Sequence, residues 1–239
     1  MWFIQASWNL AIHAEKESIH VLSCALYEIT IKFVQLCEEI TASNLETLRI
    51  SYVLLELLLK TRHHSALKFR IMLARQKSET KDEHLIAARQ HLSGLEDTLQ
   101  QLQDRDPSRN SDQKLRDYMR LYAFEIELVA GNWESLGQHV NAPEFGLLPL
   151  DILKLAADKV VHDEACPSGI IYLTLKSTMD AIMKRDPSFN LAKFSTWFRV
   201  LIQSACVSNV STCMELIDQA IQLVKAYTPD VISFSVDFA

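Results

Sequence analysis

Apolar residues recur along this chain at alternating steps of three and four positions. Runs that begin at Leu85 and Leu115 show the spacing. The longest run consists of Ile19, Leu22, Leu26, Ile29, Phe33, Leu36 and Ile40. Residues at these steps lie on one face of an α-helix, whereas the apolar residues of a half-buried strand alternate at every second position. The pattern predicts helices along most of the chain.

Prolines and glycines divide the periodic runs from one another. All six prolines fall between runs, where a missing backbone N–H costs little. Gly131 closes one run, which predicts a left-handed helix end before a new helix at Trp133. The third predicted helix is long enough to break near His63-His64. The predicted helices are Trp2–Glu15, Ser18–Ile40, Leu45–Lys77, Asp82–Gln103, Asp112–Ala130, Trp133–Val140, Leu148–Val161, Gly169–Lys184, Leu191–Val207 and Ser211–Ala226.

The third predicted helix is apolar on more than one side. One stripe consists of Leu48, Tyr52, Leu55 and Leu59, and Val53, Leu54, Leu57 and Leu58 occupy much of the remainder. Such a helix is covered by neighbours on two sides, as stacked helix pairs require. Pairs start near residues 2, 45, 112, 148 and 191, and helix-pair repeats recur at about 34 to 47 residues, so only the second interval is stretched. We therefore expect an all-α fold, a tetratricopeptide-like helical-pair solenoid of about ten antiparallel helices. This degenerate repeat domain would span residues 1–228 and precede a C-terminal tail at 229–239.

Composition narrows the functional classes. Only five of the 239 residues are glycine, so the turns of strand-rich folds and the phosphate loops of nucleotide-binding folds are not expected. The net charge of −6 disfavours direct binding of nucleic acid. The five cysteines form no CxxC pair, which favours free thiols in a reducing compartment. We expect an intracellular, soluble protein without a signal peptide or a membrane span.

Residues that could carry chemistry are scattered. Motifs for nucleotide binding, serine hydrolysis and zinc proteolysis are all missing from the sequence. Adjacent His63 and His64 point about 100° apart on a helix and cannot chelate one ion together. The pairs His13/His20 and His84/His91 are each seven residues apart, and we interpret them as solvated or edge histidines. We expect no catalytic, cofactor-binding or metal-binding residues; the enzyme alternative would use His162 near Cys166, or Glu38-Glu39.

Two features suggest partner binding instead. The basic stretch Lys60–Lys77 either receives an acidic segment of a partner or forms a solvated helix face. The tryptophans Trp2, Trp8, Trp133 and Trp197 either pack in the core or anchor a partner helix or peptide. The candidate partner-binding residues are Trp8, Asn9, Trp197 and Arg199.

Several segments, in this order, resemble one family. Trp2–Ile12 is similar to a Trp-Asn-Leu-Ala helix of meiotic tetratricopeptide-like proteins. Phe189–Leu201, followed by the helix Met214–Lys225 and the joint at Tyr227-Thr228-Pro229, is similar to an aromatic helix of these proteins and the Tyr-Pro joint after it. Leu45–Ile50 and Gly131–Leu136 fit between these two segments. The chain thus resembles the Zip-four or sporulation-twenty-two type of meiotic scaffold, called testis-expressed-eleven in mammals.

The resemblance implies a nuclear, non-enzymatic hub on meiotic chromosomes. Such a hub joins crossover-promoting recombination proteins and synapsis proteins to chromosome axes, and it uses no cofactor, small-molecule substrate, nucleic acid or membrane. The chain departs from the family in being several times shorter and in its tail, where Ile232, Phe234, Val236 and Phe238 alternate as in a strand. Partner sites that the family carries in later repeats would then be missing. The alternative is a helical-repeat adaptor or regulatory domain outside meiosis.

Overall fold

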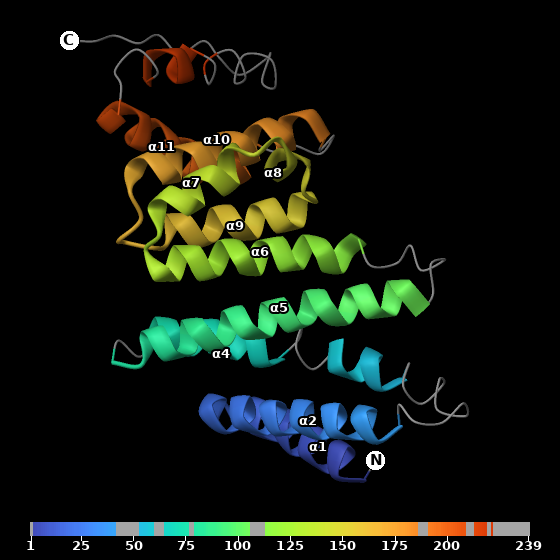
Figure 1. Ribbon diagram of the computed structural model, residues 1–239. Helices are drawn as coiled ribbons and strands as arrows, with labels where there is room; N and C mark the ends of the chain where they lie inside the picture. Colours follow the sequence, from blue (N-terminus) through green and yellow to red (C-terminus); the bar gives the residue numbers. More distant parts are fainter. Residues whose placement is uncertain are drawn as a thin grey trace, which may run out of the picture. The chain divides into compact units, whose positions relative to one another are not determined.

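The computed structural model describes residues 2–41, 53–59, 65–76, 79–105, 113–185, 191–208, 213–218 and 221. These residues are helical apart from short connections, and none of the described ranges contains a strand (Figure 1). The all-α prediction is confirmed. The chain divides into two compact units, Met1–Asn132 and Trp133–Ala239. The predicted tail at 229–239 and the predicted break at His63-His64 lie outside the described residues.

The first unit consists of helices that pack mainly on their neighbours in the chain. The bounds are α1 Trp2–Lys16, α2 His20–Thr41, a helical segment at 53–59, α4 Leu67–Gln76, α5 Lys81–Arg105 and α6 Gln113–Ala130. Helix α1 packs on α2, α2 on α4, and α4 on α5, while α6 contacts both α4 and α5 (Figure 1).

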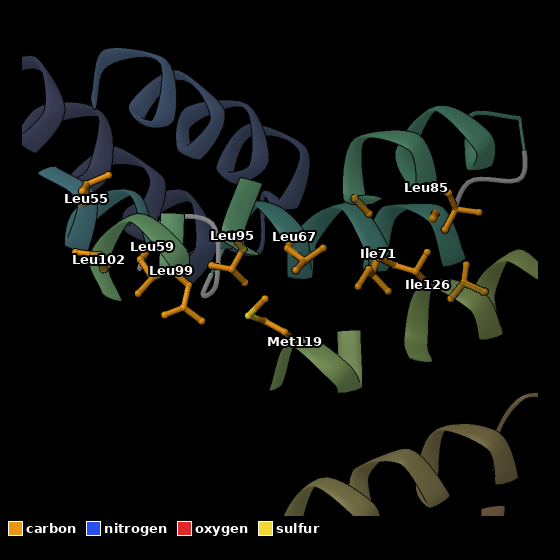
Figure 2. Close-up of a cluster of buried hydrophobic side chains, with 13 residues drawn as sticks. Leu55, Leu59, Leu67, Ile71, Leu85, Leu95, Leu99, Leu102, Met119 and Ile126 are labelled. Carbon is orange, nitrogen blue, oxygen red and sulfur yellow. The ribbon is translucent and has the colours of Figure 1, made fainter. Parts of the chain in front are cut away.

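Two hydrophobic cores lie on opposite sides of α4 and the segment at 53–59. Leu54, Leu58 and Phe69 face the core shared with α1 and α2. Leu55, Leu59, Leu67 and Ile71 face the other core, where Leu95, Leu99, Leu102, Met119 and Ile126 from α5 and α6 meet them (Figure 2). The prediction that this part of the chain is apolar on two sides is confirmed for these residues.

The second unit is arranged around α10. Its helices are α7 Trp133–Asn141, α8 Pro143–Leu147, α9 Leu150–Val161, α10 Ser168–Arg185 and α11 Leu191–Ser208, and residues 213–218 are also helical. Helix α10 contacts α7, α8, α9 and α11. Buried side chains lie on several of its sides, among them Ile170, Leu175, Met179 and Ile182, as a helix surrounded by neighbours requires.

Two details of the second unit differ from the sequence-based expectation. Pro143–Leu147 forms a short helix where a joint was expected, because proline at the first helical position needs no N–H partner there. Cys206 and Cys213 form a disulfide, so the expectation of free thiols is wrong for this pair. Seven residues of continuous helix would separate the two cysteines by about 10 Å. Helix α11 ends at Ser208, between them, and their Cα atoms lie 5.1 Å apart.

Two helices of the first unit end in the same backbone motif. After α6, Gly131 adopts a φ of 74°, its N–H donates to Leu128 and the Asn132 N–H donates to Glu127. The predicted left-handed helix end is confirmed. After α1, Ser18 takes the equivalent place with a φ of 59°, and the Ile19 N–H donates to the carbonyl of Ala14 at 2.8 Å. Glycine tolerates this conformation without the steric cost that a Cβ adds.

Replacing Ser18 by glycine should therefore stabilise the fold. We expect Ser18→Gly to raise the free energy of unfolding by about 1 kcal/mol, because it relieves the left-handed strain at a small cost in unfolded-state entropy. Urea unfolding followed by circular dichroism measures the change. Ser93, exposed within α5, provides the control: Ser93→Gly should lower stability by about 0.5 kcal/mol. A loss of stability in Ser18→Gly would contradict this account of the turn.

Candidate functional site

Trp8 lies between the surface and the core of the first unit. It is half-buried, its ring meets Tyr27 edge-on with centroids 5.3 Å apart, and it packs against the core of α1, α2 and α4. Its neighbour Asn9 is exposed and accepts a hydrogen bond from Gln5 Nε2 at 3.1 Å. Much of the Trp8 ring is therefore used to hold α1 on α2, and only the remainder is open to a partner.

Trp197 and Arg199 are not brought together. Trp197 packs against two clusters of buried side chains in the second unit, one that includes Leu175 and one that includes Met179. Its indole N–H donates to Asp158 at 3.2 Å. Arg199 is exposed. Residues two positions apart lie about 160° apart on a helix, so these two side chains point in nearly opposite directions. The structure gives Trp197 a packing role and leaves partner binding by Arg199 as a prediction.

A broader apolar surface lies on α1 and α2. Six large apolar side chains are exposed here: Trp2 (73%), Phe3 (62%), Leu10 (56%), Leu22 (47%), Ile29 (43%) and Leu36 (52%). We call these six residues the outer face. Single exposed leucines are common on protein surfaces, but a contiguous apolar patch marks an interaction site or an aggregation risk.

The six residues form one patch because α1 and α2 run antiparallel in a fixed register. Phe3 stacks on Phe33 with centroids 5.6 Å apart, and Thr30 Oγ1 donates to Ser7 Oγ at 2.8 Å. Each step forward along α1 is thus matched by a step back along α2. The same register places Leu10 across from Leu26, beside the stripe that Leu22, Ile29 and Leu36 form on α2.

The outer face points away from α4. Tyr27 is buried and stacks on Phe69 of α4 with centroids 6.1 Å apart, and Ile31 is buried in the same core. Ile29 lies two residues from each of them, and such a step turns about 160° around a helix. Helix α2 is therefore apolar on two opposite sides. One side packs on α4, and the other is not covered by any described helix.

A polar cluster joins α2 to α4 and α5. The guanidinium of Arg70 on α4 donates to both carboxylate oxygens of Glu28 on α2, at 2.6 and 2.7 Å. From α5, His91 Nε2 lies 3.2 Å from Glu28, and His84 Nδ1 lies 2.9 Å from Arg70. Of the two interpretations, solvated or edge histidines, the first is wrong: His84 and His91 are half-buried, and seven residues apart they share the helix face turned toward Arg70 and Glu28.

This cluster also changes the interpretation of the basic stretch Lys60–Lys77. Arg70 is turned inward to Glu28, and Lys68 lies 3.7 Å from Glu15 and over the ring of Phe69. Arg75 is exposed, and Lys60, Arg62 and Lys77 lie outside the described residues. Of the three described bases, Arg70 and Lys68 thus face α2 and α1, and Arg75 is left for an acidic partner.

Burial and ion pairing act in opposite directions on Glu28. Burial by itself would raise the pKa of its carboxyl, but hydrogen bonds from His91 and Arg70 and their charges outweigh burial and lower the pKa from 4.5 to about 2. The side chain is only 22% exposed. Because the folded pKa lies below the ordinary value, the ionised form stabilises the fold above about pH 4.5, and this stabilisation disappears as the pH falls toward 2.

The described residues of the enzyme alternative, His162 and Cys166, each form a hydrogen bond with a backbone carbonyl. Burial, aided by the charge of Asp163, raises the pKa of the Cys166 thiol to about 12, so its nucleophilic thiolate is disfavoured at neutral pH. His162 is exposed, with Nδ1 2.6 Å from the carbonyl oxygen of Asp158. The side chains of Glu38 and Glu39 lie outside the described residues. Among described residues, no three His, Cys, Asp or Glu side chains converge as metal ligands.

Comparison of the chain with protein-family models, with curated proteins and with solved structures finds no match. The family resemblance of Trp2–Ile12 and Phe189–Leu201 accordingly stays a prediction. Within the described residues, the helices are too short or too polar to cross a lipid bilayer.

The outer face is the feature that sequence reasoning missed. Leu22, Leu26, Ile29, Phe33 and Leu36 form the most regular apolar stripe of the chain, yet three of them are exposed and two are half-buried. The core side of α2 is instead made by Cys24, Tyr27, Ile31 and Val34. The sequence signal was a second apolar side on α2, which is more than one covered side requires.

The pH dependence of the stabilisation that Glu28 provides can be tested directly. We expect Glu28→Gln to lower the free energy of unfolding at pH 7 by about 2 to 3 kcal/mol, because it leaves Arg70 without its carboxylate. The difference between variant and wild type should shrink as the pH falls from 4.5 toward 2. Urea unfolding at a series of pH values measures both.

Glu96, an exposed carboxylate on α5, provides the matched control. Glu96→Gln should change stability by less than about 0.5 kcal/mol at every pH, as exposed substitutions generally do. An equal gap between wild type and Glu28→Gln at pH 7 and pH 2.5 would show that Glu28 is not held ionised by the cluster.

Proposed function

We propose that this chain is a non-enzymatic scaffold that binds other proteins, and that the outer face on α1 and α2 is one of its docking surfaces. The observation that carries the proposal is the exposure of six large apolar side chains on one side of a single helix pair. Aromatic and aliphatic residues clustered in this way supply most of the free energy of protein–protein binding when they are buried.

The packing of the first unit supports a helical-repeat architecture for this scaffold. In a solenoid each helix pair buries one face inside the pair and another against the next pair. Helices α1 and α2 follow this arrangement on the side of α4, through Tyr27 and Phe69. A terminal pair that ends a solenoid carries a polar outer face. The outer face of the pair α1–α2 is apolar instead. An apolar outer face is typical of a pair on which a further helix or helix pair docks.

The setting that we propose is meiosis. The order of the segments resembling Zip-four-type scaffolds supports a nuclear hub that links recombination and synapsis factors to chromosome axes. Trp2, Phe3 and Leu10 of the outer face belong to the first resembling segment, Trp2–Ile12. The alternative of a helical-repeat adaptor outside meiosis uses the same surface. Confinement of the protein to meiotic cells favours the first setting, and its presence in dividing somatic cells favours the second.

Partner binding should depend on α2 through Ile29 and Leu36. We expect the double variant Ile29→Gln/Leu36→Gln to bind a purified partner at least ten-fold more weakly, because burying either side chain contributes about 1.5 kcal/mol or more. Candidates would be identified by affinity purification with the full chain from meiotic and non-meiotic cells. Isothermal titration calorimetry with each purified candidate then measures the dissociation constant.

The matched control uses Ile86, which is 55% exposed on α5, in the same unit but outside the outer face. Ile86→Gln should leave the dissociation constant unchanged, and all variants should keep the wild-type unfolding midpoint. If every purified partner binds the double variant as tightly as the wild type, the outer face is not the docking surface. Partners recovered only from non-meiotic cells would favour the adaptor alternative.

A further inference from the structure

The Cys206–Cys213 disulfide joins an exposed residue to a buried one. Cys206 lies in the last turn of α11 and is exposed, whereas Cys213 begins the helical residues 213–218 and is only 5% exposed. A disulfide is broken by a thiolate that reaches one of its two sulfurs, and exposed disulfides are the labile or regulatory ones. A thiolate from solution can therefore approach this bond from the side of Cys206.

The disulfide tethers a very short helix. Residues 213–218 make about one and a half helical turns, and isolated helices shorter than about 12 residues are marginal in water. Cys213 and Leu216 of this helix are buried in one hydrophobic cluster with Leu201 and Ala205 of α11. Two buried side chains are a small attachment for a helix of this length, so its place on α11 depends on the covalent bond as well.

Two other cysteines are poor competitors for this bond. Cys24 and Cys166 are buried, and burial raises the pKa of both thiols to about 12. The thiolate is the attacking species in thiol–disulfide exchange, and at neutral pH these two thiols stay protonated. Opening of the Cys206–Cys213 bond therefore depends mainly on thiols from solution.

We propose that Cys206 and Cys213 form a reversible thiol–disulfide switch, which fixes the helix at 213–218 on α11 when it is oxidised and releases this helix when glutathione reduces it. Disulfides of proteins in a reducing compartment such as the nucleus are usually transient or redox-sensing. The inference uses the proposed nuclear setting only to name the reductant. It concerns the second unit alone and does not depend on the outer face.

The exchange proceeds in two balanced steps. The thiolate of one glutathione attacks Cys206 Sγ, the bond between the two cysteines breaks, and its electron pair leaves with Cys213 Sγ, which takes up a proton. A second glutathione thiolate attacks the glutathione sulfur of this mixed disulfide, and Cys206 leaves as a thiolate. Two glutathione molecules are thereby oxidised to glutathione disulfide, and the protein disulfide is reduced to two thiols. Glutathione disulfide drives both steps in reverse.

A redox titration of the purified full chain tests reversibility. We expect about 5 mM reduced glutathione to open the bond near neutral pH without denaturant, and an excess of glutathione disulfide to close it again. Mass spectrometry after alkylation follows the peptides that carry Cys206 and Cys213. A bond that opens only when urea unfolds the chain would be a structural disulfide and would overturn the inference. A pair that glutathione disulfide never closes in the folded chain would also overturn it.

Hydrogen exchange measures the release of the helix. Amides at 213–218 should exchange at least about ten-fold faster in the reduced chain than in the oxidised chain, because the bond restricts the open state. Cys206→Ser removes the exposed sulfur and leaves Cys213 in place, so these amides should exchange fast under both conditions. Val207→Ser, a change at the neighbouring residue that is 77% exposed, provides the matched control and should keep the wild-type response. Equally slow exchange in oxidised wild type, reduced wild type and Cys206→Ser would show that the bond does not control this helix.

Discussion

The rotation of α2 about its own axis, which places Tyr27 against Phe69, determines which side of this helix remains open. An α-helix that is apolar on two opposite sides can pack on a neighbour in two rotations about its own axis, and hydrophobic burial alone does not choose between them because it has no direction. In this chain Tyr27 and Ile31 face α4. Every residue of the opposite stripe is then turned outward by the geometry of the helix. The candidate docking surface is a consequence of this rotation.

Polar contacts hold α2 in that rotation. The stripe of Leu22, Ile29 and Leu36 is at least as apolar as the covered side, so burial would not penalise the reverse rotation. The Glu28 carboxylate, which meets Arg70 and His91, makes the difference. Removing one member of a buried ion pair costs about 3 to 5 kcal/mol, comparable to burying two leucine side chains. Because this pair is only partly buried, the cost here is smaller. It nevertheless favours one rotation of α2, whereas hydrophobic burial favours neither. The cluster therefore works mainly as a determinant of helix rotation.

The apolar periodicity predicted where helices lie along the chain better than it predicted which side of each helix is buried. The bounds of α1, α5, α6, α7 and α10 agree with prediction to within two residues, because breaks at Gly131 and the prolines are local signals. The rotation of α2 could not be predicted, because it depends on Arg70, 42 residues away from Glu28. For the same reason His84 and His91 looked like solvated residues. The Cys206–Cys213 disulfide depends on where α11 ends, and helix ends are the least certain part of a periodic pattern.

An open apolar stripe has a cost that a docking partner would remove. The stripe gains only part of its possible burial from folding, because Leu22, Ile29 and Leu36 stay 47%, 43% and 52% exposed. Most of the stability of this unit therefore comes from the cores on either side of α4. A partner that covers the stripe adds burial only in the bound state, and mass action then stabilises the α1–α2 pair in proportion to the logarithm of partner concentration. Rotation of α2 toward the reverse packing would hide the stripe and destroy the surface. The cluster at Glu28 thus preserves the proposed docking surface by the same contacts that keep α2 attached to α4 and α5.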